Sequence, residues 1–137
     1  MYVQPYVFFD GRCDEAIEFY KKAVGATVEM LVRFKDAPEM PKNENLKPGS
    51  ENNVMHSSLK IGDSIVMATD GYAGGNPEFK GFALSLSVKS VAEAERSFNA
   101  LAEGGKVTMP LGKTFWSERF GMLTDRFGVE WMINYIA

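Results

Sequence analysis

The chain has 137 residues, with 15 Lys and Arg against 18 Asp and Glu, a net charge of −3, and 45% hydrophobic residues. These proportions are ordinary for a globular domain, and the length allows a sizeable apolar core. The acidic balance and the lack of a basic run exclude a typical nucleic-acid-binding surface. Short apolar runs broken by charges exclude a membrane-spanning helix. Since a single cysteine, Cys13, also excludes an internal disulfide, we expect a cytoplasmic protein.

The first predicted elements are a strand and a helix. Residues 2–9 are rich in aromatic and β-branched residues and end at the turn dipeptide Asp10-Gly11. A helix follows and ends at Gly25, a residue typical of helix C-caps. Its apolar side chains have helical spacing, at Ala16, Phe19, Tyr20 and Ala23.

Three strands complete the first half of the chain. Residues 26–34 predict one strand, and residues 54–61 and 64–69 predict a hairpin that turns at Gly62-Asp63. Residues 35–53 between them are polar and contain three prolines. We interpret them as a long loop, either a mobile flap or an ordered cover over a site.

The second half repeats this order after a Gly-rich connector at 71–81. Residues 82–88 predict a strand, and residues 91–105 predict a helix with an apolar face at Ala94, Phe98 and Leu101. A strand at 106–111 and two strands around a turn at 125–128 complete the second half.

The two halves align at a shift of 79 residues. Each aligned pair predicts a shared role in the helix core, at the helix end or in the strand core. The pairs are Phe19 with Phe98, Ala23 with Ala102, Gly25 with Gly104, Val28 with Val107, and Met30 with Met109. We therefore predict an α+β fold of tandem βαβββ modules, 1–70 and 82–137, within one domain spanning 1–137. Neither module can bury its sheet face alone, so we expect the two to pair.

This pattern resembles the vicinal oxygen chelate superfamily, which includes glyoxalase I, extradiol dioxygenases and bleomycin-resistance proteins. Within it, the chain is similar to the PhnB-like branch. The resemblance rests on PYVFFDGRCDEAIEFYKKAVGA, VMHSSLKIGDSIVMATD and KTFWSERFGMLTDRFGVEWMIN. It implies curved mixed sheets that surround a cup, and a homodimer that can exchange modules between subunits.

Many members of the superfamily bind a divalent metal through four residues, two from each module. The resemblance places these positions at Gln4, Met67, Ala83 and Met132. Alanine has no donor atom, and thioether sulfur is too soft for hard or borderline divalent ions. We therefore expect no metal and no other cofactor.

Strand alternation predicts which side chains line the cup. Phe82, Leu84, Leu86 and Val88 should face the helix, which leaves Ser85 in the cup, and the repeat transfers this orientation to Tyr6 and Phe8. The dense aromatic segment 115–120 provides another candidate wall. The expected lining has an apolar body with polar groups, which suits a small organic ligand. The candidate ligand-binding residues are Gln4, Tyr6, Phe8, His56, Ser58, Met67, Ser85, Phe115, Trp116, Phe120 and Met132.

His56, the only histidine, is a weak catalytic candidate because no partner for it is evident in the sequence. Alternation places it on one face with Val54 and Ser58. Cys13 lies before the first helix, where a helix N-terminus lowers a thiol pKa, so a reactive cysteine is an open alternative.

Three functional hypotheses follow. The first is a metal-free protein that binds a small organic molecule. The second is a glyoxalase-, lyase- or isomerase-like enzyme that uses His56 with Tyr6 or Gln4, or an unorthodox metal site. The third is a structural dimer with a filled cup. A methyltransferase activity, a label sometimes given to this branch, is not supported, because the Gly-rich segment 70–81 leads into a strand rather than a helix.

Overall fold

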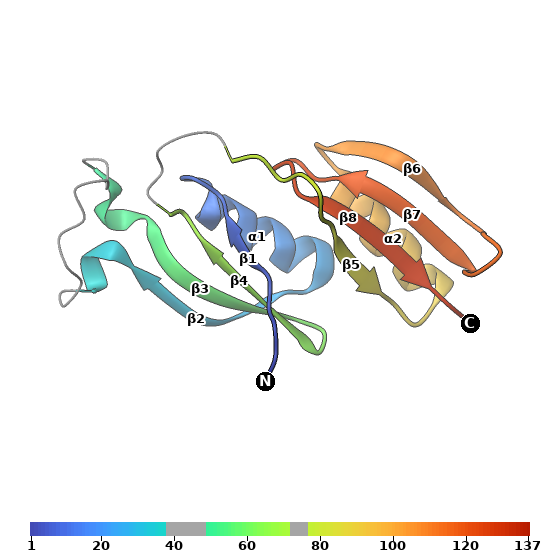
Figure 1. Cartoon of the computed structure of the whole chain (residues 1–137), viewed down its shortest axis with the longest axis horizontal. Coiled ribbons are helices and arrows are strands. Elements are labelled where there is room, and N and C mark those ends of the chain that lie inside the picture. Colours follow the sequence, from blue (N-terminus) through green and yellow to red (C-terminus); the bar gives the residue numbers. More distant parts are fainter. Residues whose placement is uncertain (38–48, 72–76) are drawn as a thin grey trace. The chain divides into compact units, whose positions relative to one another are not determined.

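The computed structural model describes residues 1–37, 49–71 and 77–137, and it divides into two compact units, Met1–Pro77 and Glu78–Ala137 (Figure 1). Residues 38–48 of the predicted polar loop and 72–76 of the predicted connector lie outside this description. The fold is α+β, as predicted: each unit has the order βαβββ, with one helix and one mixed four-stranded sheet. No helix in the described residues is long and apolar enough to cross a membrane.

The first unit contains four strands and one α-helix, with a short 3₁₀ turn at each end of the predicted polar loop. Its sheet has the order β1-β4-β3-β2, and β1 runs parallel to β4 while the other pairs are antiparallel. The elements are β1 (Tyr6–Phe8), α1 (Cys13–Val24), β2 (Thr27–Arg33), η1 (Phe34–Asp36), η2 (Ser50–Asn52), β3 (Val54–Ile61) and β4 (Ser64–Thr69).

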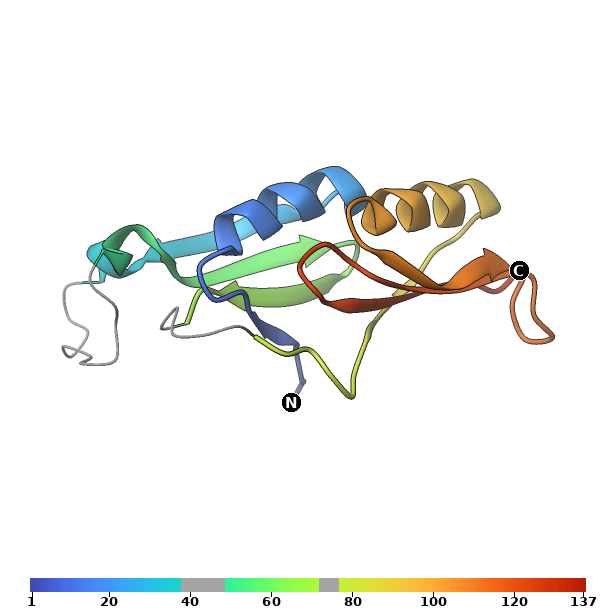
Figure 2. The ribbon, with the colours of Figure 1, turned by 90° about the horizontal axis from the view of Figure 1, so that it is seen from above.

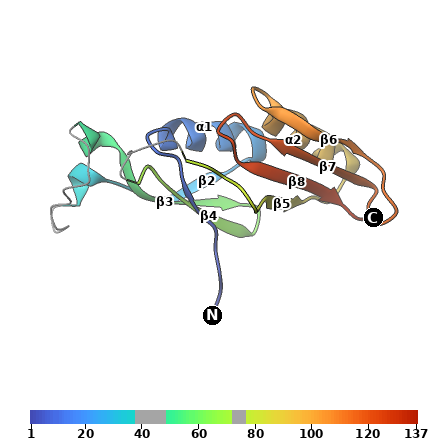
Figure 3. The same cartoon turned by 45° about the horizontal axis from the view of Figure 1, so that its top comes forward.

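The second unit repeats this arrangement with the strand order β5-β8-β7-β6, so that β5 and β6 form the sheet edges (Figure 3). β5 is parallel to β8, as β1 is to β4. The elements are β5 (Leu84–Ser87), α2 (Val91–Ala102), β6 (Lys106–Gly112), β7 (Arg119–Thr124) and β8 (Glu130–Tyr135).

The 79-residue repeat extends to the register of the strands. Tyr6 pairs with Met67 in the first sheet, and Ser85, which is 79 residues after Tyr6, pairs with Met132 in the second. Met67 and Met132 therefore occupy equivalent places. The edge strands β2 and β6 also have irregular pairing at equivalent points, between residues 28 and 30 and between residues 107 and 109.

Each helix covers one face of its own sheet and leaves the other face without a helix (Figure 2). In the first unit Val7, Phe9 and Leu59 are buried on the side of α1. The ring of Phe9 lies 6.1 Å from that of Tyr20 on the helix. Trp131, Ile133 and Leu123 are buried in the second unit, together with Ala94, Phe98 and Leu101 of α2 as predicted.

The aligned positions in the edge strands do not form strand cores. Val28 and Met30 on β2 are exposed, as are Val107 and Met109 on β6. The prediction was wrong here because edge strands with interrupted pairing do not keep a strict alternation of buried and exposed side chains.

Local irregularity also explains three smaller errors. β5 begins at Leu84, so Phe82 precedes the strand and is exposed instead of facing the helix. Val54 is fully buried and does not share the face of His56, because the pairing of β2 and β3 shifts between Val32 and Arg33. On α1, Ile17 is buried, whereas Phe19 is only half-buried.

Candidate functional site

The face of the first sheet that points away from α1 gathers five of the predicted site residues. We call the side chains of Tyr6, Phe8, His56, Ser58 and Met67 the open face. Tyr6 pairs with Met67 on β4, and Met67 pairs with Ser58 on β3, so these three side chains form one row across the sheet. Tyr6 and Phe8 remain 41% and 53% exposed, which leaves their rings available for contact.

A short hydrogen bond joins two residues of the open face that are 50 positions apart. The Tyr6 hydroxyl lies 2.7 Å from Nδ1 of His56, and the two rings meet edge-on with centroids 5.4 Å apart. Partial burial, with a smaller contribution from Cys13, raises the pKa of Tyr6 above its usual value. The phenol therefore keeps its proton at neutral pH and donates it to Nδ1. His56 thus has a partner that the sequence analysis did not find.

Neighbouring groups extend this pair in two directions. The ring of Phe8 stacks on that of Tyr6 at a centroid distance of 5.4 Å and an angle of 28°. The Ser58 hydroxyl lies 3.5 Å from Nε2 of His56, at the limit of a hydrogen bond. With Tyr6 donating to Nδ1, the neutral imidazole carries its proton on Nε2 and presents a donor beside Ser58.

The corresponding face of the second sheet has different chemistry. Ser85 pairs with Met132, and Met132 pairs with Met122, so this row combines one hydroxyl with two thioethers. In the next row Asn134 lies between Ser87 and Phe120. The Oδ1 atom of Asn134 is buried and has no hydrogen-bond partner among the described residues. No titratable group appears in these two rows.

The predicted aromatic wall is a continuous cluster of three rings beside β7. Phe115 meets Trp116 at 4.7 Å, and Trp116 meets Phe120 at 5.3 Å, both in edge-on geometry. Phe120 is buried, whereas Phe115 is 97% exposed. The cluster belongs to the second unit, and the open face belongs to the first.

The positions that hold a metal in many relatives do not fit one here. In the first unit Gln4 is half-buried just before β1 and Met67 lies on β4, which provides an amide and a thioether. In the second unit Ala83 precedes β5 and Met132 lies on β8. Across residues 1–37, 49–71 and 77–137, no three His, Cys, Asp or Glu side chains are grouped so that they could hold a metal ion.

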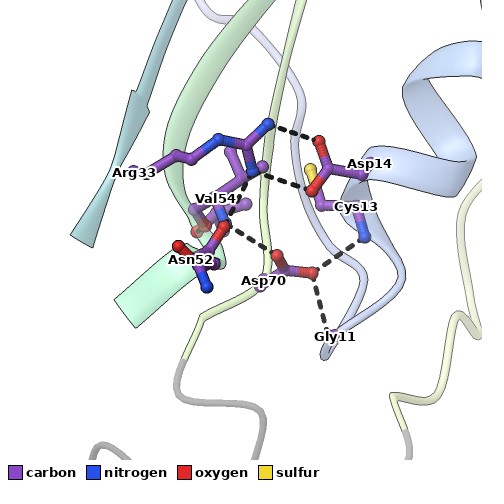
Figure 4. Close-up of polar contacts among 8 residues, drawn as sticks. Gly11, Cys13, Asp14, Arg33, Asn52, Val54 and Asp70 are labelled. Atoms are coloured by element: carbon purple, nitrogen blue, oxygen red, sulfur yellow. Dashed lines mark hydrogen bonds and ion pairs between the residues drawn. The ribbon is translucent and has the colours of Figure 1, made fainter. Parts of the chain in front are cut away.

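A buried carboxylate supports the open face from the far end of β4 (Figure 4). Asp70 is 2% exposed and follows Thr69. Its Oδ1 accepts hydrogen bonds from the backbone N–H groups of Gly11 and Cys13 at 2.9 and 2.8 Å, and its Oδ2 accepts one from Val54 at 2.8 Å. These bonds join the end of β4 to the start of α1 and the start of β3.

Cys13 is not a reactive thiol in this setting. It is fully buried, and burial together with the negative charge of Asp70 raises its pKa to about 12. The expectation of a lowered pKa was wrong because removal from water and a neighbouring carboxylate both disfavour the thiolate, whatever the position on the helix.

An ion pair lies next to this carboxylate and joins α1 to β2. Arg33 donates from both terminal nitrogens to the two carboxylate oxygens of Asp14, at 2.8 and 2.9 Å, and also to the carbonyl of Asn52. The hydrogen bonds from Arg33 lower the pKa of Asp14. The pair holds the first turn of α1 against η2 (Figure 4).

Comparisons with known proteins agree with this architecture. The model of the Glyoxalase/Bleomycin resistance protein/Dioxygenase superfamily matches residues 3–133. Protein YjdN of Escherichia coli is 35% identical over 99% of this chain and 96% of its own. The crystal structure of protein PA1353 from Pseudomonas aeruginosa has a TM-score of 0.85 at 45% identity and covers 99% of this chain and 98% of its own.

A PhnB protein from Bacillus cereus is similar at 25% identity, with a TM-score of 0.79, and covers 98% of this chain and 99% of its own. The family model spans nearly the whole chain, and the relatives share its full length. The chain therefore belongs to the Glyoxalase/Bleomycin resistance protein/Dioxygenase superfamily, with PhnB-like proteins among its structural neighbours.

Proposed function

We propose that this superfamily member binds a small organic molecule on the open face of its first module, without a metal ion. The observation that carries the proposal is the 2.7 Å hydrogen bond between Tyr6 and His56 on a surface of exposed aromatic and thioether side chains. Small-molecule sites combine an apolar surface with a few placed polar groups, and the open face has this composition.

The donor chemistry of the inherited metal positions supports a metal-free site. Gln4 with Met67, and Ala83 with Met132, offer no carboxylate or imidazole. His56 is the one good ligand for a borderline metal on the open face, and its Nδ1 is already hydrogen-bonded to Tyr6.

Native mass spectrometry with elemental analysis of the same sample tests this proposal. The protein is purified without a metal-affinity tag, so that no metal is introduced. We expect an organic adduct and less than 0.1 equivalent, roughly, of any transition metal, the level at which a stoichiometric site is excluded. Stoichiometric zinc, nickel, manganese or iron would overturn it. The same spectrum reports the number of subunits and so tests the expected homodimer.

Variants locate the adduct on the chain. Tyr6→Phe removes only the hydroxyl, and we expect it to lose about tenfold in affinity for the identified molecule, the value of one hydrogen bond. Tyr2→Phe is the matched control, because Tyr2 is exposed and lies outside every strand and helix. Equal losses in both variants would contradict a site on the open face.

The same hydrogen bond favours a second candidate, a proton-transferring enzyme. His56 has a hydrogen-bonded phenol at Nδ1 and a free position at Nε2, an arrangement suited to a general base. If turnover of the identified molecule is found, His56→Ala should abolish it while circular dichroism and the unfolding midpoint stay unchanged. Retained turnover in the folded variant would exclude this role for His56.

A further inference from the structure

The hydrogen-bond donors on the open face are arranged in a line along β3. Side chains alternate along this strand: Ser57, Leu59 and Ile61 are buried, while the residues between them point away from α1. The side chains on the open side are His56, Ser58 and Lys60. Lys60 is exposed and extends the row beyond the five residues of the open face. An imidazole N–H, a hydroxyl and an ammonium therefore follow one another at a spacing of about 7 Å.

Carboxylates are absent from the strand positions around this row. The neighbouring open-face positions are occupied by Tyr6 and Phe8 on β1 and by Ile65, Met67 and Thr69 on β4. The acidic side chain nearest in the strand pairing is Glu29 on the edge strand β2, which is exposed and lies 3.5 Å from the Thr27 hydroxyl. The row on β3 thus offers one positive charge and several donors beside an aromatic surface.

Tyr6 determines the proton position on His56. Since its hydroxyl donates to Nδ1, the imidazole proton lies on Nε2, toward Ser58. The open face then presents donors at His56 and Lys60, whose natural complement is an anionic oxygen. Beside them the stacked rings of Tyr6 and Phe8, two strands away, offer a flat apolar contact for a ring system.

We propose that the ligand of the open face is a small aromatic carboxylate, whose ring contacts Tyr6 and Phe8 and whose anion is bound by the donor row His56, Ser58 and Lys60. This inference rests on the proposed function and narrows it to one chemical class. Charge complementarity selects the anion, and the apolar rings select an aromatic body over a simple inorganic ion.

A matched pair of probes tests the inference on the intact protein. 2-Naphthoate and 2-naphthamide have the same ring system and differ in charge. We expect naphthoate to shift the NMR resonances of Tyr6, His56, Ser58 and Lys60 in a saturable manner. Naphthamide should bind about tenfold more weakly, the value of one charge-assisted hydrogen bond. The affinity for naphthoate should also fall as sodium chloride is raised, because salt screens the charge of Lys60.

Two lysine variants show where the charge acts. Lys60→Gln should reduce the affinity for naphthoate to that for naphthamide and leave naphthamide unchanged. Lys22→Gln, on the exposed surface of α1, should change neither. Both substitutions are at exposed positions, so folding is preserved, and a superimposable NMR spectrum outside the site verifies this.

The outcomes separate this inference from the proposed function. Equal affinity for naphthoate and naphthamide at the open face would overturn the choice of an anion while supporting a small-molecule site. Shifts confined to other parts of the chain, or no saturable shifts, would overturn the assignment of aromatic carboxylates to this face. The adduct found by native mass spectrometry decides the proposed function independently of either result.

Discussion

Helices α1 and α2 occupy the same place in their modules, but their first turns are held by groups at different distances along the chain. Ser90 caps α2 locally: its side chain accepts a hydrogen bond from the backbone N–H of Glu93 at 3.1 Å, and the Glu93 carboxylate accepts one from the N–H of Lys89. At α1 the N-cap position is Arg12, which makes no such bond. Asp70, 57 residues after Cys13, accepts from its N–H instead.

This difference shows that a repeated fold can keep its topology while the interactions that stabilise it change. The second module uses a capping pattern contained within five residues, whereas the first module uses a buried carboxylate that joins three segments. The helix-facing rows differ in the same way. Ser57, Ala68 and Val7 form the row in the first sheet, and Gly121, Ile133 and Leu86 form the equivalent row in the second.

The largest contrast should appear in thiol chemistry at the two helix starts. Because its pKa is raised to about 12 from 9.0, Cys13 should have about 10³-fold less thiolate than an ordinary cysteine at pH 8. We expect iodoacetamide to modify it only when the protein unfolds. Ala92→Cys in a Cys13→Ala background places a thiol at the equivalent, exposed position of α2 and should react readily. Similar labelling rates, measured by mass spectrometry, would contradict the contrast.

Asymmetry in capping should also appear in stability. Asp70→Asn keeps one acceptor oxygen but directs an amide N–H2 at a backbone N–H, so we expect unfolding to become easier by about 3 kcal/mol. Ser90→Ala should cost about 1 kcal/mol, the usual value of an N-cap. Asp63→Asn in the exposed hairpin turn is the control and should be near neutral. Urea unfolding measures all three, and an Asp70 effect no larger than that of Ser90 would remove the distinction.

Gly121 tests the packing difference between the helix-facing rows. A Cβ atom at this position would lie 2.7 Å from Cε2 of Phe98 and 2.9 Å from Cα of Leu111, so Gly121→Ala should destabilise the protein by about 1–3 kcal/mol. Gly112→Ala is the matched control, because nothing lies within 4 Å of a Cβ atom there. A destabilisation of Gly112→Ala equal to that of Gly121→Ala in thermal unfolding would show that glycine itself, and not the approach of α2, matters.

The smallest effect concerns the ion pair of the first module. Arg33 lowers the pKa of Asp14 in the folded state, so the pair stabilises the protein above the unfolded pKa of Asp14 and loses this effect as pH falls through the folded pKa. In Arg33→Gln the pKa of Asp14 should rise toward its usual range. Asp14 is more than half exposed, so the free energy of unfolding should change by about 0.5 kcal/mol or less.

Carboxyl NMR titration of Asp14 measures this shift directly. Lys21→Gln, which breaks the exposed pair with Glu18, is the control and should leave Asp14 unchanged. An unaltered Asp14 titration in Arg33→Gln would contradict the assigned cause.

The sequence predicted the order of elements and much of their orientation because both depend on local periodicity. Alternation correctly separated Tyr6 and Phe8 from the buried Val7 and Phe9. The pattern Ser-x-x-Glu before an apolar helix would also have identified the cap at Ser90. Periodicity failed where strand pairing is irregular, as at Val54, because a register shift depends on the partner strand.

The contacts that build the candidate site could not be predicted in this way. Tyr6 and His56 are 50 residues apart, and only the parallel pairing of β1 with β4 brings them together. The role of Asp70 likewise depends on the closeness of three segments that share no local pattern. Whether the residues named in advance bind a ligand remains a prediction for the experiments above.

The distance over which each buried carboxylate acts has a consequence for folding kinetics. Asp125 accepts hydrogen bonds from residues two, four and six positions ahead, so the β7–β8 turn can form as soon as that short segment collapses. Asp70 must wait until the chain from Gly11 onward is gathered, since its partners lie up to 59 residues away. Non-local contacts of this kind require the closure of long loops and form late. We therefore expect the second module to contribute the folding nucleus and the first to dock its helix after the rate-limiting step.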